Sequence, residues 1–527
     1  MCGLSSELQL LVISYLAPLD IYHLEATYRE FRDLTQDFAG AIWKECLLRQ
    51  CLLNGVFWPS YNNLTEPAQF KLAATSALRF VKTYERGVAS LPVSGQSTSV
   101  TIQADNEDIL DFYLVQGGRF LITLEPGRIA MWDITQTPDR SSAILVWTRD
   151  NKYEVDVLQA TRIIDATAIL LLFTLRNPRN RPCYDDPDPS NLSGQYSMEY
   201  LILEVCPKDG GQGFKVRREK FLCLTAPDFE PTANSFTFFT GTVLLHIVNP
   251  MAESIFIVWD YVSDSLASVR FDSDRTIHGT ILRQNFLFNV LSDGVEFFEI
   301  PPHHPVKDGS WEIRDGRASP GHLLSYAEPI GSCSYEGGAV RAGRWKEWAF
   351  TGPDILNPSH LENHARVYEL MEDVHGFRDR FTLHHFSVHF SPTHPKDSTV
   401  KLVGKYELGW GEEGCLWERE VKPAFSRVCD GRNAVLWIDD ADNGVGTPTQ
   451  YLAIYPSVDY SSSTGKQASP KFAEVRVRLP NYLHSQDYLY ETCPVSGTLA
   501  VLRNDTIAGE PFIRCCRRVG FKFRDLI

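Results

Sequence analysis

The feature that most constrains the fold is a change of pattern along the chain near residue 100. Beyond this point, short runs of β-branched, aromatic and aliphatic residues alternate with turns rich in Gly, Pro, Asp and Asn, which is typical of strands. The clearest runs are Phe112–Val115, Phe120–Leu124, Ile129–Trp132, Ile169–Phe173, Tyr200–Val205, Val243–Val248, Ile255–Trp259, Phe286–Val290, Val295–Ile300, Ala434–Ile438, Tyr451–Tyr455 and Leu499–Leu502. Convincing helical periodicity is absent there. The larger part of this 527-residue chain is therefore predicted to be all-β.

Three of these segments repeat one arrangement, in which a strand, a turn and a second strand end in an aromatic residue followed by an acidic one. The three pairs are Trp132-Asp133, Trp259-Asp260 and Phe298-Glu299. The arrangement resembles the inner strands of WD40-type β-propeller blades, although the Gly-His half of that signature is missing. At roughly 40–45 residues per blade the region exceeds seven blades, and the long loops 177–197 and 301–321 absorb the excess. We expect a seven-bladed propeller; six or eight blades, a sandwich pair or an irregular β domain remain alternatives.

The first fifty residues have the spacing of short helices. Leu8, Leu11, Val12, Tyr15 and Leu16 recur at i, i+3, i+4, i+7 and i+8, which places them on one face of a helix. A unit of about 45 residues buries too small a share of its surface to be a stable domain by itself. Some of this apolar surface should therefore contact a partner or the rest of the chain. A plain helical cap on the β region is the alternative.

Start and stop signals divide this part into four helices. Pro18 should end the first helix, and a fourth should run from about residue 38 past Trp43 to residue 48. The expected start signals are Ser6 with Gln9 for the first helix, Asp20 for the second and Thr27 with Glu30 for the third. Ile21 and Leu24 lie on the second helix, and Phe31 and Leu34 share a face of the third.

The order of residues in these helices resembles the F-box family, and its fungal members most. The positions that carry the resemblance are Leu4, Ser5, Ser6, Glu7, Leu8, Val12, Leu16, Pro18, Leu19, Asp20, Ile21, Leu24, Thr27, Arg29, Phe31, Arg32, Leu34, Ile42 and Trp43. Departures are Ser5 for the usual proline, Val12 for isoleucine and Tyr28 for a small residue. The loss of proline weakens the pre-organisation of the helix start, because proline fixes φ at the first helical position.

The resemblance implies a docking role and a function. In this family, apolar side chains of the first helices enter a groove on the Skp-type adaptor of a cullin–RING ubiquitin ligase. The residues expected at that contact are Leu4, Ser5, Leu8, Leu11, Val12, Leu16, Leu19, Asp20, Ile21 and Leu24, with Asp20 capping and orienting. Phe31, Leu34 and Trp43 would hold the helices together. The chain would be a substrate receptor whose β region binds a target protein; a scaffold that binds the adaptor without ubiquitin ligation is the alternative.

A further helix should connect the two parts. Pro67 is well placed at its first turn, and the apolar positions from Phe70 to Val81 form a stripe that runs to about residue 84. This helix either sets a fixed spacing between adaptor and target, or it has only a packing role within the fold. We therefore divide the chain into an F-box helical domain at 1–50, a helical linker at 51–94 and a β-propeller-like substrate-binding domain at 95–527.

Composition narrows the function classes. With 51 Lys and Arg against 66 Asp and Glu, the net charge is −15, which argues against general nucleic-acid binding. The twelve Cys lack zinc-finger spacing, and no secretory signal or membrane span is expected. A reduced cytoplasmic or nuclear protein with free thiols fits these features. No cofactor or metal is expected.

Candidate active sites are weak. The stretch Gly409–Gly414 matches G-x-G-x-x-G, but no β-α-β unit surrounds it and two glutamates stand where a pyrophosphate would lie. Glu412, Glu413 and Glu418 fit an acidic loop better than a catalytic set. The pairs His303-His304 and His384-His385 are adjacent, so the side chains of a pair in a strand would point to opposite faces. We expect a non-catalytic subunit.

Overall fold

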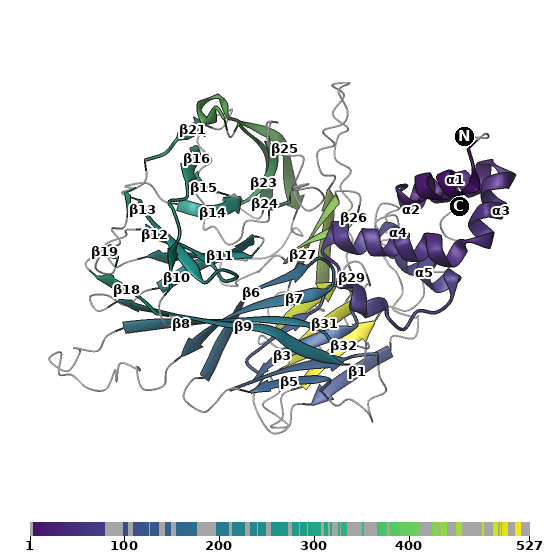
Figure 1. Cartoon of the computed structure of the whole chain (residues 1–527), viewed down its shortest axis with the longest axis horizontal. Coiled ribbons are helices and arrows are strands. Elements are labelled where there is room, and N and C mark those ends of the chain that lie inside the picture. The colour runs from purple at the N-terminus through teal and green to yellow at the C-terminus, as the bar shows by residue number, and fades with distance from the viewer. Residues whose placement is uncertain are drawn as a thin grey trace.

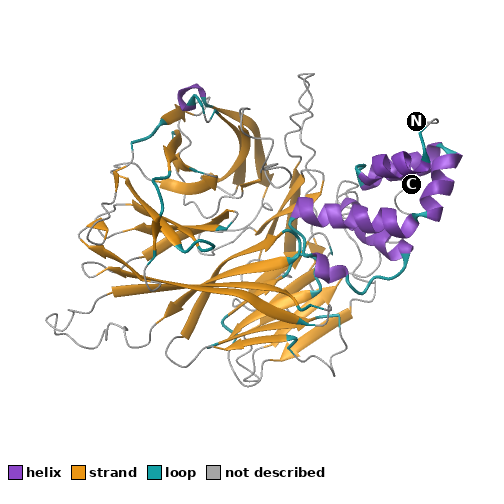
Figure 2. Ribbon diagram, viewed as in Figure 1, coloured by secondary structure: helices purple, strands orange, loops and turns teal. Residues whose placement is uncertain are grey.

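The computed structural model describes residues 4–79 without a break and, between 98 and 517, mainly the strands with many of the turns that join them; the longest gaps are 80–97, 177–195, 335–349, 352–365, 410–423 and 456–476. Helices form the first part, and strands form nearly all of the second (Figures 1 and 2). Among the described helices, none is long and apolar enough to cross a membrane.

The predicted helices are present with shifted limits. They are α1 (Ser6–Ser14), α2 (Pro18–Thr27), α3 (Arg29–Asp37) and α4 (Ala39–Asn54), followed by the 3-10 helix η1 (Trp58–Tyr61) and α5 (Pro67–Ala74). α4 is longer than expected; it ends at Asn54 and is followed by Gly55, which adopts the left-handed conformation that glycine tolerates. Pro67 occupies the first turn of α5, as predicted. Pro18 opens α2 rather than merely ending α1, because its fixed φ suits a first helical position.

The predicted start signals of the first three helices are wrong. α1, α2 and α3 begin after Ser5, Ala17 and Tyr28, and none of these residues makes a side-chain cap. Asp20 lies inside the first turn of α2, and the Thr27 hydroxyl donates back to the His23 carbonyl. The missed signal is at α5, where Gln69 Oε1 accepts from the Glu66 amide at 3.1 Å.

The described strands form seven antiparallel meanders, two of them with added edge strands. In chain order the first six are β2 (Asp111–Leu114), β3 (Phe120–Glu125), β4 (Arg128–Asp133) and β5 (Leu145–Thr148); β6 (Glu154–Ile164), β7 (Ala168–Arg176), β8 (Tyr196–Pro207) and β9 (Phe214–Ala226); β10 (Thr232–Phe239), β11 (Thr242–Val248), β12 (Ser254–Asp260) and β13 (Ser265–Phe271); β14 (Ile277–Arg283), β15 (Phe286–Leu291), β16 (Gly294–Glu299) and β21 (Gly331–Ser334); β22 (Phe350–Thr351), β23 (Arg366–Gly376), β24 (Arg380–Phe390) and β25 (Thr399–Gly409); and β26 (Ala424–Cys429), β27 (Arg432–Asp439), β28 (Thr449–Tyr455) and β29 (Val477–Arg478).

The seventh sheet joins the two ends of the strand region. It contains β30 (Tyr488–Cys493), β31 (Thr498–Arg503) and β32 (Phe512–Arg517), and its fourth strand is β1 (Thr98–Gln103). β1 pairs antiparallel with β32, so that Thr98 lies opposite Arg517. Several neighbouring sheets also touch: β2 contacts β30 and β6, β10 contacts β6 and β14, β21 contacts β25, and β26 contacts β30.

The three predicted repeats are confirmed as the hairpins β3–β4, β11–β12 and β15–β16. In each hairpin the acidic residue lies opposite the first residue of the preceding strand: Asp133 opposite Phe120, Asp260 opposite Thr242, and Glu299 opposite Phe286. All twelve predicted runs fall on described strands, apart from terminal residues.

The predicted loop 301–321 is partly wrong. It contains β17 (His304–Pro305), β18 (Ser310–Arg314) and β19 (Arg317–Ala318), and β20 (Ser325–Tyr326) follows it. β17 and β20 pair with β13, while β18 pairs with β9. This segment therefore adds strands to the edges of two preceding sheets.

Candidate docking surface on the N-terminal helices

Helix α1 has apolar side chains around most of its circumference, and only one side of it faces the protein core. Ile13 is fully buried, while Leu8, Leu11 and Tyr15 are 49, 54 and 76 % exposed. Leu4, just before the helix, is also exposed. The spacing of 4, 8, 11 and 15 forms one line along the helix. We call these four residues the α1 face.

Exposed apolar residues concentrate in the helical part. Of the eleven large hydrophobic side chains that are exposed in the described residues, eight lie before residue 80: Leu4, Leu8, Leu11, Tyr15, Tyr28, Phe38, Leu52 and Leu72. The others are Leu110, Val146 and Val262. A contiguous exposed apolar patch on a soluble protein marks an interaction surface. Four of the eight form the α1 face, where their spacing brings them together along one helix.

The residues predicted to contact an adaptor divide into three groups. Leu4, Ser5, Leu8, Leu11 and Asp20 are exposed, and Val12, Leu16, Leu19 and Leu24 are half-buried. Ile21 is fully buried in the helical core. It therefore cannot serve as an anchor in this conformation, and we assign it to the core instead. The docking roles of the other residues stay predictions.

The residues predicted to hold the helices together pack in one core. Phe31 and Trp43 are buried, and Leu34 is half-buried against the same cluster. The sequence prediction missed Ile13, Cys46 and Leu47, which share this core. Ile13 was missed because α1 has apolar residues on both sides, so the sequence alone does not show which side is buried.

The helix ends are fixed by charged side chains. The Arg49 guanidinium on α4 donates hydrogen bonds to the carbonyl oxygens of Ser14, the last residue of α1, and of Leu16 just beyond the helix. At the other end, a hydrogen bond with Ser5 lowers the pKa of the exposed Glu7, which lies in the first turn of α1. A carboxylate there also complements the positive end of the helix dipole.

A pocket of about 360 Å³ lies between α2, α3, α4 and α5. On its wall, Lys71 Nζ of α5 is 2.7 Å from Glu25 Oε2 and lies over the rings of Tyr22 and Trp43, at 4.1 and 4.9 Å from their centroids. Burial and the Glu25 charge raise the pKa of the Tyr22 hydroxyl. These contacts tie α5 to α2 and α4, and α4 in turn contacts α1.

The segment after α4 joins the helices to two sheets. The Phe57 amide donates to the Gln116 carbonyl at 2.8 Å, and the Trp58 amide donates to the Ala166 carbonyl at 2.7 Å. Gln116 lies in the β2–β3 turn and Ala166 in the β6–β7 turn. We call the segment 57–61 the joint.

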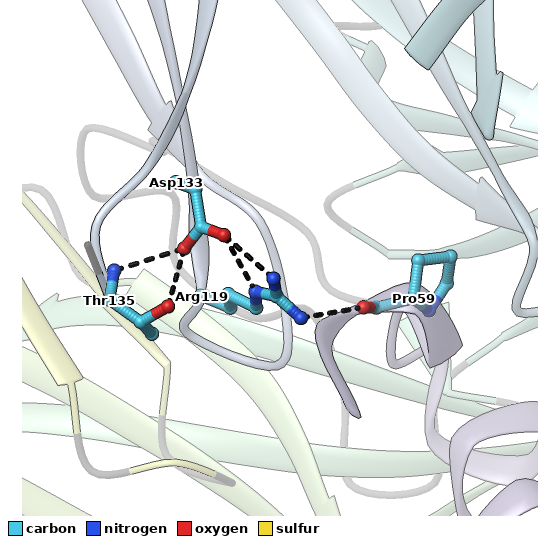
Figure 3. Close-up of polar contacts among 4 residues, drawn as sticks. All are labelled: Pro59, Arg119, Asp133 and Thr135. Atoms are coloured by element: carbon cyan, nitrogen blue, oxygen red, sulfur yellow. Dashed lines mark hydrogen bonds and ion pairs between the residues drawn. The ribbon is translucent and has the colours of Figure 1, made fainter. Parts of the chain in front are cut away.

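Arg119 connects the joint to one of the predicted aromatic–acidic pairs (Figure 3). Its Nη2 and Nε lie 2.7 and 3.0 Å from Asp133 Oδ2, and its Nη1 donates to the Pro59 carbonyl at 3.5 Å. Thr135 donates its amide and hydroxyl to the other Asp133 oxygen, at 3.0 and 2.6 Å. Burial alone would raise the pKa of Asp133, but these hydrogen bonds hold it below its ordinary value.

Gly117 allows the joint to approach closely. Its φ is +117°, and a Cβ there would collide with Ser60 of the joint. The Gly117 amide donates to Cys493 Sγ at 3.1 Å, at the end of β30. One buried cluster extends from Ile13 in α1 to Cys493 and Ala500 in the seventh sheet. The helices therefore pack on the strand region and are not merely tethered to it.

The structure adds little support for the candidate active sites considered from the sequence. Of Gly409–Gly414, only Gly409 is described, at the end of β25; Glu412, Glu413 and Glu418 lie outside the described residues. His384 and His385 are neighbours in β24, and His304 begins β17. Within the described residues, no three His, Cys, Asp or Glu side chains are close enough to hold a metal ion.

Comparison with known proteins leaves the family open. No family model and no curated protein matches the sequence. Among solved structures, the WD40 domain of SCAP from fission yeast is similar, with a TM-score of 0.34 and 10 % identity over 79 % of this chain and 83 % of that chain. The Nup133 β-propeller domain of Vanderwaltozyma polyspora has a TM-score of 0.28 and 8 % identity over 81 % and 98 %. TM-scores this low do not define the function.

Proposed function

We propose that the N-terminal helices are an F-box-type module and that the α1 face binds a Skp-type adaptor. The observation that carries this proposal is the exposure of Leu8, Leu11 and Tyr15 along one line of a helix whose opposite side is buried. A helix that presents such a line suits a partner with an apolar groove. Leu16, Leu19 and Leu24 would extend the contact, because each retains some exposed surface.

The strand region is, in this proposal, a seven-bladed β-propeller. Two observations support it: the described strands include seven sheets built on four-stranded antiparallel meanders, five of them from four strands consecutive in the chain, and β1 completes the sheet of β30, β31 and β32. Pairing the first strand with the last would close a ring of blades, because the sheet that ends the chain is then held by a strand from the start of the strand region.

The receptor function follows from joining these two parts. The joint would hold the α1 face at a fixed place relative to the strands, through Phe57, Trp58 and Arg119. A target protein bound to the strand region would then be presented to ubiquitin-charged enzymes held by the adaptor and cullin. The chain would contribute proximity rather than catalytic side chains.

Co-purification tests the proposal. The full chain should bring down both adaptor and cullin, and Leu8→Asp/Leu11→Asp should lose both, because the charges would have to enter an apolar groove. Val146→Asp/Val262→Asp is the matched control, since these residues are exposed on the strand region. Recovery of the adaptor without the cullin would favour the alternative, a scaffold that binds the adaptor without ubiquitin ligation. Failure of the wild-type chain to bring down an adaptor would contradict the proposal.

A further inference from the structure

The pocket between α2, α3, α4 and α5 is open because small side chains line it. These four helices lie together beside the strand region (Figure 1). Ala26 and Ala68 line the pocket and are exposed, and Ala39 on α4 is half-buried. The volume of about 360 Å³ is at the lower end of the range that small-molecule sites occupy. The pocket therefore offers apolar surface to a ligand of modest size.

The charged side chains that line this pocket leave one positive charge without a counterion. They are Glu25, Lys71 and Arg32. Lys71 and Glu25 pair at 2.7 Å, with both side chains mostly buried, so their charges cancel. The Arg32 Nε donates to the Glu25 carbonyl oxygen at 3.0 Å, and within the described part of the chain no carboxylate pairs with its guanidinium. The pocket thus carries a net charge of one cation.

Arg32 and Gln36 both line the pocket from α3. They are four residues apart, which makes them neighbours on the surface of this helix. The bond from Arg32 Nε restricts the guanidinium and leaves its Nη groups to donate elsewhere. The exposed Gln36 amide is a further donor beside it. Donors arranged in this way suit the two oxygens of a carboxylate.

The charge balance selects among anions. A single unpaired cation neutralises a monoanion, whereas a phosphate dianion would need a second one. Lys71 does not supply it, because Glu25 already holds its ammonium group. The occupant that fits is an acid with one carboxylate and an apolar body.

We propose that this pocket binds a small monocarboxylic acid. Arg32 and Gln36 hold the carboxylate, and Ala26, Ala39 and Ala68 contact the apolar body. The site uses none of the residues of the α1 face, so it does not rest on the proposed function.

Ligand-observed saturation-transfer NMR on the full chain tests the site, with hydrocinnamate as the probe. Hydrocinnamide and phenylpropylamine are matched controls, because they keep the ring and the alkyl chain but have a neutral and a cationic head. Hydrocinnamate should bind at least about tenfold more tightly than the amide, since hydrogen bonds between ions are stronger than those of neutral groups. The amine should bind less tightly than either.

Substitutions separate the charge from the space. Arg32→Gln should weaken hydrocinnamate binding at least about tenfold and leave the amide unchanged, whereas Arg29→Gln should have no effect, because Arg29 is exposed on the same helix and does not line the pocket. Ala26→Leu should weaken acid and amide alike by filling the pocket. Thr27→Leu is its matched control, at an exposed position that does not line the pocket.

Three results would overturn the proposal: no saturation transfer to hydrocinnamate, equal affinity for the acid and the amide, or an affinity for the acid that Arg32→Gln leaves unchanged. An acetylated peptide that ends in phenylalanine carries the same carboxylate and ring. Tighter binding of this peptide than of hydrocinnamate would overturn the assignment to a free acid and identify a chain terminus as the occupant. Adaptor binding is read out separately through Leu8→Asp/Leu11→Asp, so either proposal can fail while the other stands.

Discussion

At the scale of single residues, the joint depends on Arg119. Its guanidinium contacts a buried carboxylate and a carbonyl of the joint at the same time. The corresponding position in the hairpin β11–β12 is Gly241, and in β15–β16 it is Asn285. Among these three hairpins, the one beside the joint is thus the one with an arginine there. The sequence contained this difference, but only the structure shows what Arg119 reaches.

Arg119→Ala should lower the free energy of unfolding by about 1.5–3 kcal/mol, because it leaves the buried Asp133 carboxylate without its cation. Arg29→Ala is the matched control: Arg29 pairs with Asp33 in an exposed position, and the loss should stay within about 0.5 kcal/mol. Urea denaturation followed by fluorescence measures both. Equal losses for the two variants would contradict the role of Arg119.

The pH dependence of this pair has a defined sign. The folded pKa of Asp133 lies below its ordinary value, so its ionised form stabilises the fold at neutral pH, and this contribution declines as the pH falls below about 3.9 toward the folded pKa. The difference in unfolding free energy between wild type and Asp133→Asn should therefore be largest near pH 7 and shrink below about pH 4. A difference that is constant from pH 7 to pH 3 would show that the carboxylate charge is irrelevant.

At the scale of elements, sequence patterns predicted where strands and helices lie better than which side of them is buried. The hairpins were predictable because alternating runs and turn residues are local signals. The orientation of α1 was not, because Leu10 and Ile13 on one side are as apolar as Leu8 and Leu11 on the other. The edge strands β17 to β20 were also missed, since two to five residues added to a distant sheet leave no periodicity.

Truncating a side chain on the buried side of α1 should destabilise the protein far more than truncating one on the exposed side. Ile13→Ala should lower the free energy of unfolding by about 2–5 kcal/mol, because Ile13 is fully buried. Leu11→Ala should change it by no more than about 0.5 kcal/mol, because Leu11 is 54 % exposed. Thermal or urea unfolding of the two variants distinguishes them. A larger loss for Leu11→Ala would mean that the buried side of α1 is assigned wrongly.

At the scale of the whole molecule, the helices and strands should behave as one cooperative unit. Phe57 of the joint is fully buried, and its ring centroid is 5.9 Å from those of Phe120 and Phe214, on β3 and β9. The sequence predicted a connecting helix but not this contact, because packing between segments so far apart in the chain has no local signature. The division into domains at 50 and 94 remains a prediction.

Phe57→Ala should cost about 3–5 kcal/mol and weaken both parts together. Hydrogen exchange measures this region by region: amide protection should fall in α4 and in β3 by similar free energies. Leu52→Ala, at a partly exposed position of α4, should leave both unchanged. If protection fell in β3 alone, the helices would be an independent unit and the joint would not fix their position.

The most direct test of the central claim is the affinity of the purified full chain for a Skp-type adaptor, measured by calorimetry. The account predicts binding that Leu8→Asp/Leu11→Asp weakens by at least about 100-fold, since burying each leucine contributes about 1.5–3 kcal/mol. Val146→Asp/Val262→Asp should bind like wild type. An affinity unchanged by the α1 substitutions, or no binding by the wild-type chain, would contradict it.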